Sequence, residues 1–231
     1  MTCMATADQK IPADLGIGIV AVIPAYNEER FIGSTVIKAR KFVDAVIVVD
    51  DGSCDGTAEI AQQAGAMVVR HEHNHGKGAA LHTGFCRARE LHPDVVVTLD
   101  GDGQHVVEEL PDVVQLVLSG EADIVVGSRY LEHRSKVPTE RVWGHRAFTA
   151  LTNQLSGISV TDSQSGFRAF SRHALDTLEF SSHGFSVESE MQFAAHELGL
   201  IVKEAPITIR YQDKAKRSAF THGLLVLNGV L

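Results

Sequence analysis

The sequence predicts a single α/β domain with a mostly parallel β-sheet flanked by helices. Short apolar runs rich in valine and isoleucine, such as Ala45–Asp50 and Ala122–Ser128, alternate along the chain with segments of helical pattern. These runs lack the polar alternation of a half-exposed strand, so they are typical of strands covered by helices on both faces. Strand and helix in regular alternation indicate right-handed crossovers between parallel neighbours. The 231 residues are enough for one such domain.

Each element follows from a local pattern. The strands are expected at Gly18–Ile23, Ala45–Asp50, Ala66–Arg70, Asp94–Asp100, Ala122–Ser128 and Glu204–Tyr211. The helices are expected at Glu28–Lys41, Asp55–Ala64, Lys77–Leu91, Val106–Leu118, Val142–Leu155 and Val187–Leu198. Asp55 is expected to cap the helix that it begins, because its carboxylate can accept hydrogen bonds from the free backbone N–H groups there.

The alternation changes near residue 130, and this divides the domain into two halves. Residues 17–129 read as a nucleotide-type half, and residues 130–212 as a less regular half that closes over it. Residues 213–231 form a basic and amphipathic tail. Neither a linker nor a repeat separates these parts, so one domain is expected over residues 1–231.

Composition excludes several classes of protein. A net charge of −8 argues against a general nucleic-acid binder, which usually has a basic face. No apolar run reaches the ~20 residues that span a bilayer, and no signal-peptide pattern opens the chain. Cys3, Cys54 and Cys86 are widely spaced, which favours reduced thiols. We therefore expect a cytoplasmic protein.

The unusual residues gather where the predicted strands end. They are the stretches PAYNEE, DDGSCDGT, DGDGQH and GSRY. In open α/β sheets, ligands bind beyond the carboxyl ends of the strands. The sequence therefore predicts the functional site at this edge of the sheet.

Asp100 and Asp102 are candidate metal ligands. Two residues apart on an extended chain, they point the same way and bring two like charges together. A cation would relieve this repulsion, and hard oxygen ligands suit Mg²⁺ or Mn²⁺, which keep positions open for phosphate oxygens. Gln104 continues the alternation as a neutral third ligand. The alternative is a solvated turn that happens to hold two acidic residues.

Three further motifs surround this pair. Asp51 ends a strand, where its carboxylate could accept hydrogen bonds from a nucleobase or belong to a turn. His71–His75 reads HExxH, but the zinc-protease motif needs a helix and the composition here is that of a loop. Lys77 opens a helix and could meet a phosphate there, although its surroundings are not a Walker A motif.

Arginines mark the less regular half. They are Arg129, Arg141, Arg146 and Arg168. Each alone is explained by a solvated surface position. Arg168 differs because it lies between Phe167 and Phe170, and a partly buried guanidinium demands an anion such as phosphate.

Taken together, these stretches resemble the family 2 glycosyltransferases, which have the GT-A fold. The similarity is greatest to the branch of dolichol-phosphate mannose synthases and related polyprenyl-phosphate sugar transferases. It extends from about Val20 to Tyr211, through IPAYNEE, VVDDGSCDGT, GKGAAL, LDGDGQH, GSRY, SGFRAF and APITIRY. Each piece alone is weak, but the combination in this order is highly specific.

The resemblance implies roles for single residues. The nucleotide sugar would be bound by Pro24, Tyr26, Glu28, Asp51, Lys77 and Asp100. Mg²⁺ or Mn²⁺ would be held on its diphosphate by Asp100, Asp102 and Gln104. The acceptor phosphate would meet Arg129, Arg141 and Arg168 in an acceptor half over residues 130–212. Catalytic roles would fall to Asp102, Arg129, Arg168 and Glu190.

The resemblance also implies a single inverting displacement at the anomeric carbon, with metal-assisted departure of the nucleotide diphosphate. A phosphate monoester, with a second pKa of about 6, is already ionised and needs arginines more than a base. This favours a polyprenyl or dolichyl phosphate as acceptor. A sugar hydroxyl would need a general base, for which Asp162, Glu188 and Glu190 are candidates. A sugar nucleotidyltransferase or a non-catalytic binding module for sugars or nucleotides would also be compatible with the carboxylates.

The resemblance does not assign a role to two parts of the sequence. The loop YQDKAKRS departs from the mannose synthases, so neither the sugar nor the base, UDP or GDP, is implied. The tail carries a basic cluster and then Leu224, Leu227 and Leu231 at helical spacing. It is either a helix docked on the domain or an interfacial helix in peripheral contact with an anionic membrane, at its inner face.

Overall fold

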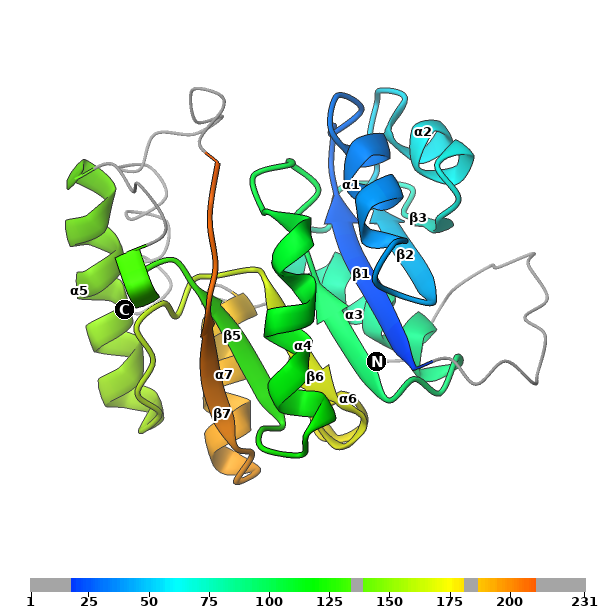
Figure 1. The fold of residues 1–231 in the computed structure, drawn as a ribbon. Coiled ribbons are helices and arrows are strands. Elements are labelled where there is room, and N and C mark those ends of the chain that lie inside the picture. The colour runs from blue at the N-terminus through cyan, green and yellow to red at the C-terminus, as the bar shows by residue number, and fades with distance from the viewer. Residues whose placement is uncertain (1–17, 134–138, 181–186, 211–231) are drawn as a thin grey trace.

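The structure is a computed structural model, and it describes residues 18–133, 139–180 and 187–210 of the chain. In these residues seven strands form one sheet (Figure 1). The strands are β1 (Ile19–Ala25), β2 (Ala45–Asp50), β3 (Met67–Arg70), β4 (Val95–Thr98), β5 (Ile124–Ser128), β6 (Arg168–Ser171) and β7 (Val202–Pro206). The helices are α1 (Ile32–Ala39), α2 (Thr57–Gln63), α3 (Lys77–Arg89), α4 (Leu110–Leu118), α5 (Thr139–Ser156), α6 (Arg172–Thr177) and α7 (Val187–Glu197), with short 3-10 turns η1 (Val107–Glu109) and η2 (Leu131–His133).

The sheet has the strand order β3-β2-β1-β4-β6-β5-β7. Strands β3, β2, β1 and β4 are parallel, β6 is antiparallel to both β4 and β5, and β7 is parallel to β5. The predicted fold class, a mostly parallel sheet flanked by helices, is confirmed. From β1 the chain runs outward to β3 and then places β4 on the other side of β1. This reversal opens a switch point between β1 and β4.

Helices cover both faces of the sheet and bury two apolar clusters. On one face α1, α2 and α4 pack against the strands through residues such as Ile32, Val36, Leu110 and Val113. On the other face α3, α6 and α7 pack through residues such as Leu81, Phe85, Leu175 and Met191. Because both faces are covered, the central strand β1 is fully buried from Val20 to Ile23. This explains the uninterrupted apolar runs in the sequence.

Some predicted elements differ from those in the structure. The strand expected over Glu204–Tyr211 ends at Pro206, after which only an isolated bridge joins His105 and Ile209. The sequence patterns do not predict strand β6 or helix α6. The expectation that Asp55 caps a helix is wrong by one residue, since Gly56 is the N-cap of α2. The Asp55 carboxylate still accepts a hydrogen bond from Thr57 N at 3.0 Å.

Two observations concern the wider expectations. Among the described cysteines, Cys54 is free and exposed, but Cys86 is disulfide-bonded. The expectation of three reduced thiols is therefore wrong for Cys86 in this structure. Across the described ranges, no helix is both long and apolar enough to traverse a bilayer. The tail from residue 213 onward lies outside the described residues.

Candidate active site

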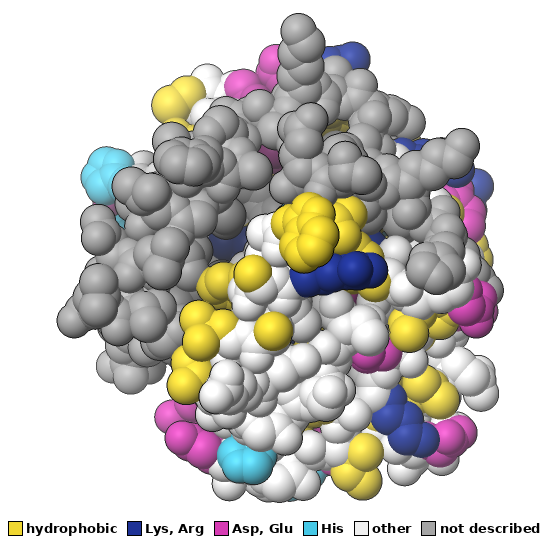
Figure 2. Space-filling model, turned by 90° about the vertical axis from the view of Figure 1, so that its left-hand side faces the viewer, with side chains coloured by type: hydrophobic (Ala, Val, Ile, Leu, Met, Phe, Trp, Pro, Cys, Tyr) yellow, Lys and Arg dark blue, Asp and Glu magenta, His cyan; other side chains and the backbone are white. Residues whose placement is uncertain are grey.

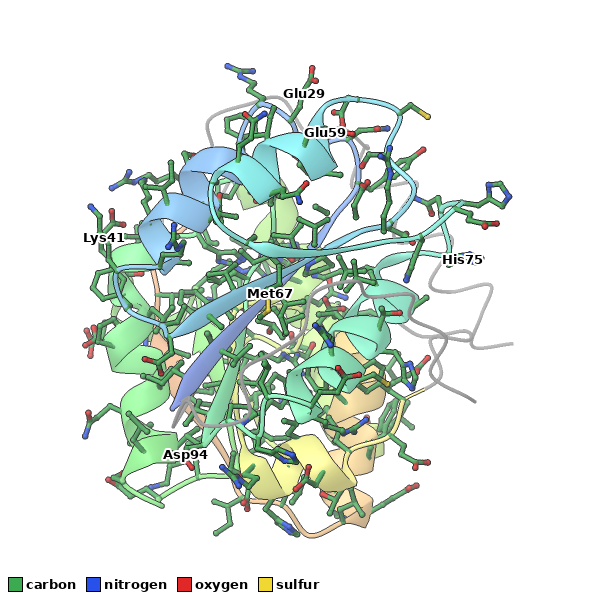
Figure 3. The ribbon with its side chains drawn as sticks, turned by 90° about the vertical axis from the view of Figure 1, so that its right-hand side faces the viewer. Glu29, Lys41, Glu59, Met67, His75 and Asp94 are labelled. Carbon is green, nitrogen blue, oxygen red and sulfur yellow. The ribbon has the colours of Figure 1, made fainter. Side chains whose placement is uncertain are left out.

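The loops after the parallel strands meet at one edge of the sheet. In Figure 3, Glu29 and His75, which follow β1 and β3, lie at the opposite end of the sheet from Asp94, which precedes β4. Asp100 and Asp102 follow β4 at the same edge as Glu29. The edge therefore lies at the switch point between β1 and β4, where open α/β sheets bind their ligands.

The loop after β4 packs closely on the end of β1. A side chain at Gly101 would bring a Cβ within 3.3 Å of Pro24 O and 3.6 Å of Glu28 Cγ. In the loop after β1, Glu28 N donates to Thr57 Oγ1 at 2.8 Å, and this hydrogen bond attaches that loop to α2. Tyr26 is 44% exposed. Pro24 on β1 and Glu28 just after it thus lie against the loop that carries the predicted metal ligands.

Asp51 is buried, and its carboxylate holds the loop before α3. The N–H groups of His75 and Gly76 donate to it at 3.0 and 2.8 Å, and His71 Nδ1 lies 2.7 Å from Oδ1. The other ring nitrogen of His71 lies 2.9 Å from Thr83 Oγ1, so the ring is fixed on both sides. Asp51 stands at the strand end as predicted, while its part in base recognition stays a prediction. The HExxH segment is a loop.

Lys77 joins the nucleotide-type half to α7. Its Nζ lies 2.6 Å from Asp100 Oδ1 and 2.7 Å from Glu188 Oε1. A Cβ at Gly166 would lie 2.7 Å from both Asp100 carboxylate oxygens and from Lys77 Nζ. Because residue 166 is a glycine, the segment before β6 can pack directly against this ion pair.

The remaining expected metal ligands lie just beyond Asp100. Asp102 Oδ1 accepts a hydrogen bond from Gln104 N at 3.0 Å, and Gln104 O accepts one from Arg210 N at 2.9 Å. His105 is buried, with Nε2 3.1 Å from Asp100 Oδ2. Across the part of the chain that is described, no group of three or more His, Cys, Asp or Glu side chains forms a metal cluster. The predicted set has two carboxylates and one amide.

The two carboxylates have opposite pKa shifts. Burial opposes ionisation of Asp100, but the charges of Lys77 and His105 outweigh it and hold its pKa well below the usual range. Burial raises the pKa of Asp102, and the charge of Asp100 raises it further. Burial opposes the charge on Lys77, but Asp100 and Glu188 raise the pKa of its ammonium group above its usual value. The negative charge of Asp100 is thus balanced by its cationic neighbours, whereas the negative charge of Asp102 is disfavoured.

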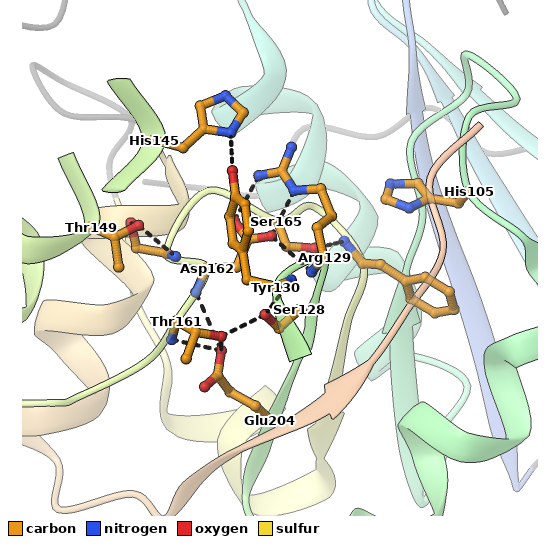
Figure 4. A network of polar contacts seen from close by, with 12 residues as sticks. His105, Ser128, Arg129, Tyr130, His145, Thr149, Thr161, Asp162, Ser165 and Glu204 are labelled. Carbon is orange, nitrogen blue, oxygen red and sulfur yellow. Dashed lines mark hydrogen bonds and ion pairs between the residues drawn. The ribbon is translucent and has the colours of Figure 1, made fainter. Parts of the chain in front are cut away.

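Arg129 follows β5 and is held by a buried carboxylate (Figure 4). Its Nε lies 2.6 Å from Asp162 Oδ2 and its Nη2 lies 2.6 Å from Oδ1, while Arg129 N donates to Oδ2 at 3.1 Å. Burial opposes ionisation of Asp162, but Arg129 outweighs it and lowers the pKa of this carboxyl. The Arg129 fork is therefore oriented by the protein before any ligand arrives.

Further hydrogen bonds extend this network. Glu204 Oε1 on β7 accepts from Thr161 N and Thr161 Oγ1, both at 2.8 Å. Thr161 Oγ1 lies 2.6 Å from Ser128 Oγ, which in turn accepts from Tyr130 N at 3.1 Å. Tyr130 OH lies 2.7 Å from His145 Nδ1 on α5 (Figure 4). The end of β5 is thus tied both to β7 and to α5.

Arg168 is almost fully buried, and its contacts differ from the expected anion. Its guanidinium donates to the backbone carbonyls of Ser163, Ser165 and Glu188 at 2.7, 2.9 and 3.0 Å. Burial lowers the pKa of Arg168. Carbonyl oxygens thus accept hydrogen bonds from all three of its nitrogen atoms, an arrangement that the sequence did not predict. Arg168 holds the segment before β6 against α7, and its contact with an acceptor phosphate stays a prediction.

The other predicted acceptor residues lie on helices beside this segment. Glu190 is partly buried in the first turn of α7, close in sequence to Glu188. Arg141 lies on α5, and its side chain is outside the described ones. Arg146, also on α5, is exposed. The structure thus joins Lys77, Asp100 and Glu188 directly, whereas within the described ranges Arg146 makes no such contact.

Residues 20–179 match the family described as Glycosyl transferase family 2. The chain belongs to this family. It is a glycosyltransferase, as the sequence motifs predicted, and its sheet is that of GT-A glycosyltransferases. The expectation drawn from the resemblance is confirmed at this level.

The names of similar proteins agree with the polyprenyl-phosphate branch of this family. The chain is 34% identical over 217 residues to the UDP-N-acetylglucosamine--dolichyl-phosphate N-acetylglucosaminyltransferase of Methanococcus voltae, covering 84% of this chain and 86% of the relative. It is 32% identical over 224 residues to the undecaprenyl-phosphate mannosyltransferase of Micrococcus luteus, covering 91% of each. Among solved structures, glucosyl-3-phosphoglycerate synthase from Mycobacterium tuberculosis, in complex with Mn²⁺, UDP-glucose and phosphoglyceric acid, has a TM-score of 0.71. Its identity is 25%, over 93% of this chain and 79% of that one.

Three residues of the site have no usable signal in the sequence. Gly166 lies in a run of small residues, and its need for a bare backbone becomes visible only against Asp100 and Lys77. Glu204 resembles an ordinary charged residue near a strand. His105 stands in the motif DGDGQH without a role of its own, although its position directly after Gln104 places it close to the carboxylates.

Proposed function

We propose that this glycosyltransferase moves a sugar from a nucleotide diphosphate sugar to a lipid-linked phosphate of the polyprenyl or dolichyl type. The observation that carries the proposal is the contact of Lys77 with both Asp100 and Glu188. It brings the carboxylates at the switch point against the half that holds Arg129 and Arg168. The names of the relatives from M. voltae and M. luteus support the acceptor class. The complex of the mycobacterial enzyme supports the donor class.

The donor would lie across the ends of β1, β2 and β4. Pro24, Tyr26, Glu28 and Asp51 stand around this edge and would bind the nucleoside. The N-terminus of the 13-residue helix α3 begins at Lys77, where backbone N–H groups and the ammonium group together suit a phosphate. On binding, the diphosphate would compete with Asp100 and Glu188 for the Lys77 ammonium.

A divalent cation fits the residues at this edge. Asp102 carries a carboxylate whose pKa is raised by burial and by Asp100, so a bound cation would relieve an existing repulsion. Asp100, Asp102 and Gln104 offer the hard oxygen atoms that Mg²⁺ or Mn²⁺ prefers, and they would hold the ion. When bound, it would neutralise the charge that develops on the departing nucleotide diphosphate.

The acceptor would approach from the half that contains β5, α5 and α7. A phosphate monoester is largely ionised at neutral pH, so it can attack the anomeric carbon directly and invert it in one step. Arg129, held in place by Asp162, would orient this phosphate, with Arg141 beside it and Glu190 lining the site. Arg168 would act through the backbone that it holds. An acceptor of this kind resides in a membrane, so we place the enzyme peripherally at its cytoplasmic face.

The experiment is a transfer assay with matched acceptors. The full chain is given UDP- and GDP-linked sugars, Mg²⁺ or Mn²⁺, and either a polyprenyl phosphate or the same polyprenol without phosphate. We expect a glycosylated lipid only from the phosphate, and loss of the product with chelator. Transfer to the polyprenol or to free sugars instead would support a hydroxyl acceptor, with Asp162, Glu188 or Glu190 as base, and would overturn the proposed acceptor.

A further inference from the structure

His105 is buried in the loop after β4, and one of its ring nitrogens has no partner. Its side chain is 5% exposed. Nε2 lies 3.1 Å from Asp100 Oδ2, but Nδ1 has no hydrogen-bond partner within the described part of the chain. A buried polar atom without a partner opposes folding, because it loses its contact with water and gains nothing in return. An apolar side chain would avoid this penalty, so the presence of a histidine calls for a role of Nε2.

The contact with Asp100 determines which atom carries the hydrogen. The pKa of Asp100 lies well below its usual range, so its carboxylate is ionised and only accepts hydrogen bonds. Nε2 of His105 therefore donates to Oδ2. The other oxygen of the same carboxylate, Oδ1, lies 2.6 Å from Lys77 Nζ. Two donors, one on each oxygen, thus fix the orientation of the carboxylate group.

His105 is held from two sides by the second half of the chain. Its ring packs edge to face against the buried ring of Phe167, with 5.3 Å between the centroids. Its backbone forms an antiparallel bridge with Ile209. Two backbone hydrogen bonds flank this bridge, from Arg210 N to Gln104 O at 2.9 Å and from Val106 N to Thr208 O at 3.4 Å. The ring therefore has a fixed place beside Asp100.

The two donors to Asp100 differ in their freedom to move. Lys77 is 37% exposed and carries its charge on a flexible stem, and Glu188 and the donor diphosphate both compete for it. His105 is buried and has no other acceptor within the described residues. When Lys77 turns to a diphosphate, His105 is the donor that stays on Asp100.

We propose that His105 is a positioning residue, which holds the Asp100 carboxylate in the orientation that a divalent cation requires. The inference rests on the proposed function, because that function assigns the cation to Asp100, Asp102 and Gln104. His105 would not contact the cation but would act through Asp100. Partners that hydrogen-bond to metal ligands orient them in this way, and their loss weakens metal binding by about 10- to 100-fold.

Three substitutions separate the hydrogen bond from the ring. His105→Gln keeps an N–H donor, and His105→Met has a similar length without a donor, so these two form a matched pair. His105→Phe keeps a ring against Phe167 but lacks the donor. The full chain is titrated with Mn²⁺ in the presence of UDP or GDP, without acceptor, and free Mn²⁺ is measured by electron paramagnetic resonance against a nucleotide blank. We expect His105→Gln to bind within about threefold of the wild type, and the other two variants about tenfold more weakly.

A transfer assay with a polyprenyl phosphate at increasing Mn²⁺ gives a second readout. In His105→Met and His105→Phe the half-saturating Mn²⁺ concentration should rise about tenfold, while the rate at saturating Mn²⁺ changes far less. His82→Phe is the matched control. His82 also packs edge to face against a phenylalanine, Phe180, at 6.1 Å, but its Nδ1 lies 4.0 Å from Cys86 Sγ rather than beside a carboxylate. It should leave both readouts unchanged.

The outcomes keep this inference apart from the proposed function. Equal Mn²⁺ affinities of His105→Gln and His105→Met would overturn the inference, because the donor would then have no effect. If His105→Met does not fold, His105→Phe takes its place in this comparison. If the wild type binds no Mn²⁺ with either nucleotide, the proposed cation is wrong and the inference fails with it. If Mn²⁺ binding follows the expected order but no polyprenyl phosphate is glycosylated, the role of His105 stands and the proposed acceptor is wrong.

Discussion

Asp100 and Asp102 are two residues apart, yet their charges have opposite consequences for the folded protein. Asp100 is ionised, and its carboxylate is already paired with Lys77 and His105 in the fold. The pKa of Asp102 is raised, so its negative charge is unfavourable in the fold at neutral pH. A carboxylate whose charge is unfavourable in the fold is a candidate for a role in function, because it does not contribute to stability.

Asp102→Asn should therefore lose activity without losing stability. We expect transfer to fall by at least about a hundredfold, because a ligand of the cation that would neutralise the departing diphosphate is removed. The free energy of unfolding in urea should stay the same or rise, since the unfavourable charge is gone. Asp176→Asn, an exposed position on α6, is the control and should change neither quantity. An active Asp102→Asn enzyme would contradict the metal assignment.

Lys77→Met tests the ion pair between the two halves. Without the ammonium group, the carboxylates of Asp100 and Glu188 stay partly buried with one cationic partner fewer. Since Lys77 is 37% exposed, we expect a loss of about 1–2 kcal/mol in the free energy of unfolding. Adding Glu188→Gln should recover part of that loss, as a double-mutant cycle measures. Strict additivity of the two variants would show that the pair contributes nothing to stability.

Among the elements, β6 brings the second half of the chain next to β4. It belongs to the second half of the chain but lies between β4 and β5. The segment before it therefore passes directly over Asp100. The halves predicted over residues 17–129 and 130–212 share one sheet, and their assignment to donor and acceptor stays a prediction.

Gly166→Ala should disturb this segment. The added Cβ would meet the Asp100 carboxylate and Lys77 Nζ at 2.7 Å, so these side chains would have to move. Because both are flexible side-chain ends, we expect a stability loss of about 1 kcal/mol but a much larger loss of transfer activity. Gly144→Ala, where a Cβ meets nothing within 4 Å, is the control and should retain activity. Equal activities of the two variants would refute the close approach.

The Arg129–Asp162 pair should make stability depend on pH. Asp162 has a lowered pKa in the fold, so its contribution is present above the unfolded value of about 3.9 and is lost as pH falls through the folded pKa. In Asp162→Asn this part of the acid-induced decrease should be missing. Urea unfolding measured from neutral pH down into the acid range checks it. An unchanged acid limb in the variant would contradict the pairing.

The sequence predicted elements well where a pattern was long. Five strands and six helices follow uninterrupted apolar runs or amphipathic segments, and each occurs in the structure within a few residues. Strand β6 was missed because it has four residues, starts with a charged one and pairs antiparallel with two distant strands. Its partners, not its own composition, make it a strand.

Of the site, the strand-end motifs could be predicted, but their partners could not. Asp100 and Asp102 were visible from spacing alone. The carboxylate of Glu188 and the bare backbone of Gly166 reach Asp100 only through the tertiary fold. For Arg168, partial burial was expected from the sequence, but the carbonyl groups that accept its hydrogen bonds were not predicted.

For the whole molecule, the two surfaces of the site have different characters. The edge formed by β1, β2 and β4 carries carboxylates and the N-terminus of α3. The other side presents Arg129 next to α5, on which the apolar side chains of Trp143, Leu151 and Leu155 are exposed. Figure 2, which looks onto the side of the molecule where α5 lies, shows hydrophobic side chains at the surface there. This asymmetry suits a water-soluble donor on one side and a lipid-linked acceptor on the other.

A single-turnover experiment tests the central claim most directly. Enzyme in excess over a nucleotide sugar is mixed with a polyprenyl phosphate, Mg²⁺ or Mn²⁺, and the products are separated. The account predicts that free nucleoside diphosphate and glycosylated lipid phosphate appear together, in equal amounts and at one rate. Release of pyrophosphate, or of nucleoside diphosphate without any glycosylated lipid, would contradict it.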